Sequence, residues 1–362
     1  MTEVESNSTN EAQGAEQTGC ACRRAVWPWG ALVAGAVLLA VGLGAGWMIG
    51  RSDRNATRGS GSSSSSESDS ERREKDGTSE SGGRSKTFTL PGGVKMEMVY
   101  VEPGSFMMGS PESEEGRVSD EKLHRVTLTE SYWIGKYPVT QAQWSALVSA
   151  MDVSFTRGRP TACFSKSGKC GDLVRGMDTS DFPMENISWN DCKALVDALN
   201  RNDREGRRWS LPTEAQWEFA ARGGNQSRGY TYSGGNEIDA VGWYYENSGL
   251  KKLSDSDWDL DKLQSNKCRS HSVKEKENGN ELGIVGMSGN VWEWCADWYG
   301  DYPEGSVTDP TGPASGEARV LRGGSWNFHA RYCRSALRDG NLPGYRYYFY
   351  GLRLCCSAGL RE

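Results

Sequence analysis

The stretch from Arg319 to Leu354 constrains the fold of this 362-residue chain more than any other part of it. It opens with the strand-like run Arg319 to Leu321 and a Gly-Gly-Ser-Trp turn, and after that turn its apolar residues follow no regular period. Helices and strands with one buried face repeat their apolar residues at roughly 3.6 and 2 positions respectively. This segment is therefore predicted to be a long, irregular loop that the rest of the fold must hold in place.

The composition also predicts a loop-rich domain. The chain has 45 glycines and 14 tryptophans, a combination that favours turns fixed by large rings over a helical bundle. Its formal net charge of -6 gives no reason to expect a nucleic acid as a partner. Its 10 cysteines are too few for a small disulfide scaffold, but they are enough for a few bridges in an oxidising compartment.

The N-terminal part contains a predicted membrane anchor. Residues 1–24 form a polar tail, and residues 25–50 carry no charge over a length that spans a bilayer core as a helix. Tryptophans lie near both ends of this segment, where interfacial anchors are expected: Trp27, Trp29 and Trp47. Because the tail is long for a cleaved signal peptide, we predict a retained single-pass transmembrane helix, with the membrane as a partner of the chain.

Self-association and orientation of this helix stay open. Gly42, Gly46 and Gly50 are spaced by four residues, which either lets two such helices approach closely or simply marks an anchor rich in small residues. Arginines occur on both sides of the segment, so the positive-inside rule does not fix its orientation. The cysteines and the aromatic loop make most sense outside the cytoplasm, and we therefore expect an extracytoplasmic domain.

Two regions of contrasting composition follow the predicted anchor. Residues 51–87 are rich in Ser, Gly and mixed charges, which cannot bury a core, so this range is predicted to be a disordered, flexible linker. Residues 88–357 contain the apolar and aromatic runs that a core needs, and they are predicted to be the folded domain. The linker would hold this domain away from the membrane.

Local signals predict several elements inside the domain. Strands are expected at 96–101 and 125–128. Helix starts are expected at three capping residues: Thr140, Ser188 and Thr213. The third helix should end at Gly223 and Gly224, and the long polar chain from there to Gly286 is predicted to form functional loops.

Several long motifs occur in a fixed order along the domain. They are MVYVEPGSFMMGS, HRVTLTESYWIGKYPVTQAQW, FPMENISWNDC, RRWSLPTEAQWEFAARGG, GMSGNVWEWCADWYG, RVLRGGSW and GLRL. Together they closely resemble the formylglycine-generating enzyme, or sulfatase-modifying factor, family, and the resemblance covers about residues 88–357. It implies an α+β, C-type-lectin-like fold with little regular secondary structure, a small twisted sheet, a few helices and long loops.

The enzymes of this family oxidise a sulfatase cysteine to formylglycine with oxygen, copper(I) and two thiolates. Copper(I) is soft and favours thiolate ligands, which come from a Gly-Gly-Ser-aromatic-x-Cys-His-x-x-Tyr-Cys motif in the enzymes. Here Ser325, His329, Tyr332 and Cys333 match that motif, but Phe328 stands where the first cysteine should be. Phenylalanine has no donor atom, so copper is not expected to bind as it does in the enzymes.

Cys333 is the remaining candidate for a catalytic residue. Its alternative role is that of a buried or disulfide-bonded cysteine, since free cysteines are often only packed. Cys295, Cys355 and Cys356 are other thiols of the domain, but nothing in the sequence places one of them opposite Cys333. His329 is open to the same two interpretations, as a ligand or as an ordinary loop residue.

Calcium is the other cofactor that the resemblance implies. By resemblance, Gly289 and Val291 would supply backbone carbonyls and Glu293 a carboxylate, while Asn247 would serve a second calcium. Gly286 stands where a side-chain oxygen helps in the enzymes, which would weaken the first site. The alternative is that the tryptophans and Glu293 of this loop are simply core and surface residues.

The C-terminal loop carries a set of side chains typical of a binding surface. Aromatic and Arg side chains dominate interface energetics, whereas a folded domain gains little from rings placed side by side in a loop. The predicted ligand-binding residues are Trp326, Phe328, His329, Tyr332, Tyr345, Arg346, Tyr347, Tyr348, Phe349 and Tyr350. The expected partner is a protein or another surface ligand whose identity the sequence does not give.

Some bacterial relatives have this loop rewritten by diversity-generating retroelements, which mutate adenines in a template rich in Asn codons. An AAC codon becomes Tyr, Phe, His, Leu, Asp or Gly by changes at its adenines alone. These types occur at Phe328, His329, Tyr332, Leu337, Asp339, Gly340, Tyr345, Tyr347, Tyr348, Phe349 and Tyr350. The alternative is an ordinary family member with an aromatic-rich loop.

The residues and the resemblance lead to one functional hypothesis and two alternatives. The hypothesis is a membrane-tethered, ligand-binding domain without oxidase activity. The first alternative is a formylglycine-generating oxidase with an altered metal site, and the second is a scaffold component of an envelope complex. By resemblance, Phe328 stands at the position of the first copper-binding cysteine. This replacement favours the hypothesis over the first alternative.

Overall fold

The computed structural model describes residues 84–254 and 258–357. These residues all belong to the unit of the chain that runs from Asp76 to Glu362. The predicted tail and membrane anchor at residues 1–50 lie outside the described residues, as does most of the predicted linker. The first strand of the described residues begins at Ser85, slightly before the expected boundary. Within the described ranges, no helix has the length and apolar character needed to cross a membrane.

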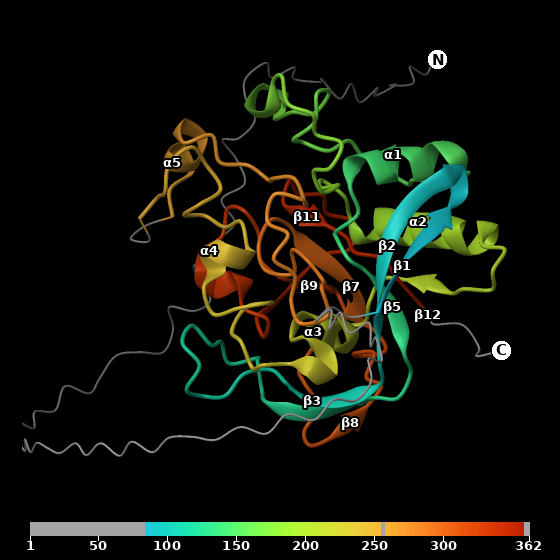
Figure 1. Ribbon diagram of the computed structural model, residues 1–362, viewed down its shortest axis with the longest axis vertical. Coiled ribbons are helices and arrows are strands. Elements are labelled where there is room, and N and C mark those ends of the chain that lie inside the picture. The colour runs from blue at the N-terminus through green and yellow to red at the C-terminus, as the bar shows by residue number, and fades with distance from the viewer. Residues whose placement is uncertain (1–83, 255–257, 358–362) are drawn as a thin grey trace, which may run out of the picture. The chain divides into compact units, whose positions relative to one another are not determined.

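The described strands form three small sheets. The largest has the order β1-β2-β5-β12-β6, with β1 (Ser85–Leu90), β2 (Val94–Val101), β5 (Tyr132–Gly135), β12 (Cys355–Ser357) and β6 (Trp209–Ser210). The β1–β2 hairpin, blue in Figure 1, turns through the 3-10 helix η3 (Pro91–Gly93). Strand β12 lies between β5 and β6, with Cys356 opposite Trp133, so the last strand pairs with strands from earlier in the chain.

The second sheet holds the C-terminal loops, and the third covers the lower end of the view in Figure 1. The second has the order β10-β9-β7-β11, with β10 (Arg338–Asn341), β9 (Arg319–Arg322), β7 (Trp292–Trp298) and β11 (Tyr350–Gly351). The third has the order β3-β4-β8, with β3 (Gly104–Met108), β4 (His124–Leu128) and β8 (Val307–Thr308). Strands β2, β4 and β9 confirm the three strands expected from the sequence.

The predicted helix starts are confirmed. The α-helices are α1 (Gln141–Ala150), α2 (Trp189–Asn202), α3 (Glu214–Ala221), α4 (Ile238–Val241) and α5 (Leu260–Ser265). Thr140, Ser188 and Thr213 each cap their helix by accepting a backbone N–H three residues on, and the side chain there caps in return. Helix α3 ends as expected, because Gly223 adopts a left-handed φ of 88° that an L side chain would strain.

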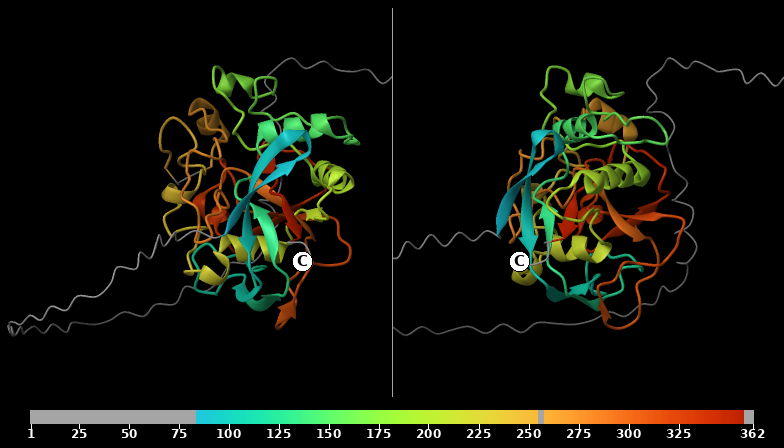
Figure 2. Two further views of the ribbon diagram at one scale, coloured as in Figure 1. Left: turned by 45° about the vertical axis from the view of Figure 1, so that its right-hand side comes forward. Right: turned by 90° about the vertical axis from the view of Figure 1, so that its right-hand side faces the viewer.

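Long irregular connections and several buried apolar clusters complete the domain. Between α3 and β7 the regular structure consists of α4, α5 and the 3-10 helix η5 (Gly224–Gln226). The other short 3-10 helices are η4 (Gly171–Val174) and η6 (Ala330–Cys333). One apolar cluster contains Trp292, Trp294 and Leu352 with residues of α1 and α2, which lie next to each other in both views of Figure 2. A second contains Trp217 and Phe219 of α3, and a smaller one contains Phe164 and Trp326.

Candidate functional site

A tight turn after β9 sets the position of the C-terminal loop. Gly323 and Gly324 have positive φ angles of 98° and 72°. A Cβ atom on Gly324 would lie 2.6 Å from the Cys333 Sγ atom and 2.7 Å from the Tyr332 carbonyl oxygen. Only glycine lets the backbone approach η6 this closely. The Gly-Gly-Ser-Trp signature therefore folds the following residues back against the strand.

The candidate site is a connected patch of rings, which we call the aromatic surface: Phe328, Tyr332, Tyr345, Tyr347, Tyr348 and Phe349. The Phe328 ring lies edge-on to Tyr332 at 5.5 Å and to Phe349 at 5.7 Å between ring centroids. Tyr347 stacks on Phe349 at 5.3 Å, and Tyr345 meets Tyr347 at 6.2 Å. Tyr345 is the most exposed member at 37%, while the others are half-buried.

Three of the predicted ligand-binding residues lie beneath this surface: Trp326, His329 and Tyr350. Trp326 is 5% exposed and meets Phe164 edge-on at 5.3 Å. Tyr350 is 5% exposed and packs against Trp294 at 5.1 Å. The His329 Nδ1 atom lies 2.9 Å from a carboxylate oxygen of buried Glu246. These three buried side chains are fixed by contacts with residues from distant parts of the chain. They therefore form a firm support for the rings of the aromatic surface.

Arg346, the remaining member of the predicted set, ties the aromatic surface to helix α2. Its guanidinium donates to both carboxylate oxygens of Asp191, at 2.7 Å and 2.6 Å, and to the carbonyl oxygens of Arg157 and Gly158. Asp191 also completes the cap of α2 at Ser188. The side chain of Arg346 is 19% exposed, and its donors are used within the protein. This residue therefore holds the loop in place. Whether it or any of the rings contacts a ligand stays a prediction.

Cys333 is a buried thiol. Its exposed fraction is 0%, and it is one of the free cysteines, whereas Cys163 and Cys170 form a disulfide. Burial raises the pKa of the Cys333 thiol well above its ordinary value, and the nearby Glu246 carboxylate raises it further. A thiol that stays protonated near neutral pH is a poor nucleophile and a poor metal ligand.

Phe328 occupies the position of the missing thiol. Its ring packs edge-on to Trp292 at 5.5 Å, besides its contacts with Tyr332 and Phe349. A carbon-only side chain surrounded by rings offers nothing to copper(I). Among the residues that the structure describes, no group of three or more His, Cys, Asp or Glu side chains is arranged to hold a metal ion.

The residues implied for calcium have other partners. Both carboxylate oxygens of Glu293 accept hydrogen bonds from Arg353, at 2.8–3.1 Å, and Trp217 Nε1 donates to one of them at 2.7 Å. A cation at this carboxylate would have to displace a buried guanidinium, so Glu293 as arranged does not fit a calcium ion. The Gly289 carbonyl accepts the N–H of Val291 at 2.9 Å.

Asn247 is likewise engaged within its own loop. Its side-chain oxygen accepts the N–H of Tyr244 at 2.8 Å, and its amide nitrogen donates to the Gly242 carbonyl at 3.0 Å. These bonds fold the loop after α4. Calcium binding therefore stays a prediction from the resemblance, with no support from the way these side chains are arranged.

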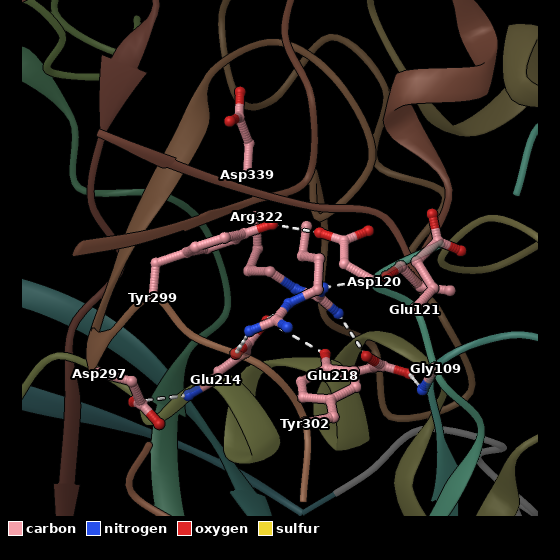
Figure 3. Close-up of polar contacts among 12 residues, drawn as sticks. Gly109, Asp120, Glu121, Glu214, Glu218, Asp297, Tyr299, Tyr302, Arg322 and Asp339 are labelled. Carbon is pink, nitrogen blue, oxygen red and sulfur yellow. Dashed lines mark hydrogen bonds and ion pairs between the residues drawn. The ribbon is translucent and has the colours of Figure 1, made fainter. Parts of the chain in front are cut away.

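A buried set of charges joins β9 and β10 to α3, and we call it the arginine network: Arg322, Arg338, Glu214 and Glu218. Figure 3 shows Arg322, Glu214 and Glu218 of this network. Arg322, fully buried, pairs with Glu218 and lies 3.4 Å from Glu214, and it donates to the Ala336 and Ser335 carbonyls. Arg338 binds both oxygens of Glu214 at 2.9 Å and 2.7 Å. The two glutamates come from α3 and the two arginines from β9 and β10, so the network fixes the sheet to the helix.

A second buried ion pair anchors the turn after η6. Arg334 binds Glu121 in a bidentate manner, at 2.9 Å and 2.6 Å, and also Glu114 at 2.6 Å. The Ser110 hydroxyl donates to Glu121 at 2.6 Å. Burial opposes ionisation of Glu121, but hydrogen bonds from Arg334 and Ser110 outweigh it and lower the pKa of this carboxyl. The sequence analysis did not predict these buried ion pairs. The sequence signal that could have indicated them is the set of arginines that flank the positions with residue types reached from an Asn codon.

Comparison with known proteins identifies the scaffold. Residues 87–358 match the sulfatase-modifying factor enzyme 1-like domain. The chaperone protein LppX of Paenibacillus barcinonensis is 32% identical over 264 residues, which are 64% of this chain and 79% of LppX. The formylglycine-generating enzyme of Streptomyces coelicolor is 37% identical over 170 residues, covering 44% of this chain and 48% of the enzyme. The chain thus aligns with about half of that enzyme's length.

Solved structures share the same architecture. Treponema denticola variable protein 1 is 29% identical with a TM-score of 0.57, and the match covers 75% of this chain and 99% of that protein. PvdO from Pseudomonas aeruginosa, 24% identical with a TM-score of 0.54 over 75% of this chain and 98% of PvdO, shows the likeness of fold. The fold expected from the sequence motifs is therefore confirmed, and this chain belongs to the family of sulfatase-modifying factor enzyme 1-like domains.

Proposed function

We propose that the domain binds a ligand through the aromatic surface and does not generate formylglycine. The observation that carries this proposal is the packing of Phe328, whose ring contacts Trp292, Tyr332 and Phe349 at the position of the first copper thiolate. The second thiol, Cys333, is fully buried, and its pKa is raised by that burial. The remains of the oxidase motif act as a frame for the rings.

The aromatic surface has the properties of a contact site. Rings such as those of Tyr345 and Tyr347 present large, rigid area at a low cost in side-chain entropy. They already contact one another, so little further ordering is needed when a partner covers them. Tyrosine is enriched among residues that dominate binding energy because its ring packs while its hydroxyl finds a polar partner. A protein surface is the partner that best fits such a patch.

We also propose that the loop is diversified between copies of the gene. The residue types at Phe328, Tyr345 and Phe349 are among those reached from an Asn codon by adenine changes, and these side chains lie on the aromatic surface. The similarity to a protein named as variable, Treponema denticola variable protein 1, supports the idea. A neighbouring reverse-transcriptase gene with an Asn-rich copy of this segment would establish it, and the absence of both would refute it.

The tether belongs to the same proposal. The uncharged segment 25–50 would cross the membrane once, and the linker 51–87 would present the domain on the extracytoplasmic side. A surface display of this kind gives a variable contact site access to external partners. Protease protection of the domain in intact cells would contradict this orientation.

Selection from a displayed library of random 12-residue peptides tests the binding function. Peptides selected on the full chain should lose at least tenfold in affinity for the double variant Tyr345→Ala, Tyr347→Ala. They should bind the matched variant Tyr230→Ala equally well, because Tyr230 lies outside the aromatic surface. Peptides that bind parent and double variant with equal affinity, or a selection that enriches none, would contradict the proposal.

An oxidase with an altered metal site is the second candidate function. It is favoured by the retention of Ser325, His329, Tyr332 and Cys333 within the motif. An oxidase would convert a Cys-x-Pro-x-Arg peptide to an aldehyde in the presence of copper(I) and oxygen, whereas a binding module would leave it unchanged. The burial of Cys333 weighs against this candidate.

A further inference from the structure

A cavity of about 290 Å³ lies between β7, the loop that follows it and the start of β4. Its wall shares no residue with the aromatic surface, and the proposed peptide contact does not involve it. The lining residues that matter chemically are His124, Glu214, Asp297, Trp298, Tyr302 and Arg338. Glu214, Asp297 and Tyr302 are seen together in Figure 3.

The hydrogen-bond donors of Arg338 and Tyr302 in the wall are already in use. Each of the three nitrogens of Arg338 donates, two of them to Glu214 and one to the Gly300 carbonyl at 2.8 Å. The Tyr302 hydroxyl also donates to Glu214, at 3.1 Å. The negative charge of Glu214 is therefore matched inside the protein, and these groups have little left to offer a ligand.

Two acceptor atoms of the wall receive no hydrogen bond from another residue in the described part of the chain: Asp297 Oδ1 and His124 Nε2. The Asp297 carboxylate also interacts with its own backbone N–H. Asp297 is 4% exposed, and its Oδ2 accepts the N–H of Glu214 at 2.9 Å. His124 is 6% exposed, and its Nδ1 lies 2.9 Å from the Lys122 carbonyl, which requires the proton on Nδ1 and leaves a lone pair on Nε2. Its ring meets Tyr302 at 4.6 Å.

The electrostatics of the cavity centre on Asp297. Unlike Glu214 and Glu218, it forms no ion pair within the described residues. The charged groups that interact with it electrostatically include Glu214 of α3, Arg338 of β10 and Arg319 of β9. Burial, and then repulsion from Glu214, raise the pKa of Asp297 to about 7. A buried, unpaired carboxylate is stabilised by a proton or by a cation that enters beside it.

We propose that this cavity binds a small organic cation with N–H donors, a primary ammonium or guanidinium group, which pairs with Asp297 Oδ1 and donates to His124 Nε2. Acceptor atoms in the wall favour a ligand with N–H donors, and a carboxylate without an ion pair favours a positively charged one. The rings of Trp298 and Tyr302 and the prolines at 310 and 313 give the cavity apolar walls for the carbon part of the ligand.

Calorimetric titration of the full chain at pH 8 tests this proposal with four probes: n-butylammonium, methylguanidinium, tetramethylammonium and butanoate. The two N–H donors should bind, tetramethylammonium should bind at least tenfold more weakly because it carries charge without donors, and butanoate should not bind. Asp297→Asn keeps an oxygen for the Glu214 N–H and should weaken n-butylammonium at least tenfold. Asp301→Asn removes the same charge from an exposed residue at the rim and should change little.

The parent protein alone provides a second readout that needs no variant. Because Asp297 gains a proton as the pH falls through about 7, affinity for n-butylammonium should drop about tenfold between pH 8 and pH 6. The proposal is overturned if neither N–H donor binds, if tetramethylammonium binds as tightly, or if both Asp variants weaken binding equally. Unchanged affinity across this pH range would overturn it as well.

Discussion

The rings of the aromatic surface and the two arginines of the arginine network belong to the same C-terminal segment but are held in different ways. In the network, each buried charge meets a partner at a fixed geometry, as Arg338 does with both oxygens of Glu214. In the surface, half-buried rings such as Tyr347 and Phe349 contact one another without directional bonds. Removal of a network residue leaves a buried charge uncompensated, whereas removal of a ring costs only its packing. The fold can therefore keep its frame while the surface changes.

The largest effect is expected from the network. Arg322→Met should lower the free energy of unfolding by about 3–5 kcal/mol, because Glu218 and Glu214 lose a buried cation. Urea denaturation measures this change. Arg175→Met removes an exposed pair with Asp172 and should cost under about 0.5 kcal/mol. Equal losses in the two variants would show that the network is not what holds the frame.

The next effect concerns Glu185, whose carboxylate holds the loop beneath the aromatic surface. Its Oε1 accepts the Phe164 N–H at 2.8 Å, and Phe164 packs against Trp326. Burial raises the pKa of Glu185 to about 8, and hydrogen bonds from Phe164 and Cys163 offset this only in part. The pKa of Glu185 is higher in the folded protein than in the unfolded chain. The contribution of protonated Glu185 to the free energy of unfolding is therefore present at low pH and is lost as the pH rises towards 8.

Glu185→Gln tests this pH dependence. In the parent, ionisation of Glu185 in the unfolded chain should remove about 2–3 kcal/mol of unfolding free energy between pH 5 and pH 7, and the variant should lack this part of the slope. Denaturation curves at the two pH values measure it. Parallel slopes for parent and variant would mean that Glu185 is ionised in the fold throughout this range.

A smaller effect is expected at the centre of the aromatic surface. Phe349→Ala removes ring contacts with Phe328, Tyr347 and Tyr348, and it should cost about 1–2 kcal/mol of unfolding free energy. The variant should remain folded, since no buried charge is affected. A loss as large as that of Arg322→Met would erase the distinction between surface and frame.

The smallest effect on stability is expected at the edge of the surface. Tyr345 is 37% exposed, so Tyr345→Asn should change the unfolding free energy by under about 0.5 kcal/mol. The same change should still reduce binding of peptides selected on the parent. A variant that loses stability but keeps peptide affinity would reverse the roles assigned to this ring.

Local sequence signals predicted the starts of the three longest described helices and three of the described strands, and long-range packing explains what they missed. The capping residues Thr140, Ser188 and Thr213 act within one helical turn, so their pattern is readable from the chain. The pair of Arg346 with Asp191 joins residues 155 positions apart, and no local pattern reveals it.

The same limit applies to the candidate site. The run of rings predicted an aromatic patch, and the structure places such a patch there. The sequence could not tell that Trp326 and Tyr350 lie beneath it, because their burial depends on Phe164 and Trp294 from other segments. The loss of the copper thiol at Phe328 was visible because a single position of a long motif was replaced by a side chain without donor atoms.

The most direct test of the central claim is incubation of the full chain with copper(I), oxygen and a Cys-x-Pro-x-Arg peptide, followed by mass spectrometry for the aldehyde. The formylglycine-generating enzyme of Streptomyces coelicolor serves as the positive control. Because Phe328 replaces one thiol and Cys333 is buried, no aldehyde should form. Aldehyde that forms with the parent and disappears with Cys333→Ser would contradict the assignment of a binding domain.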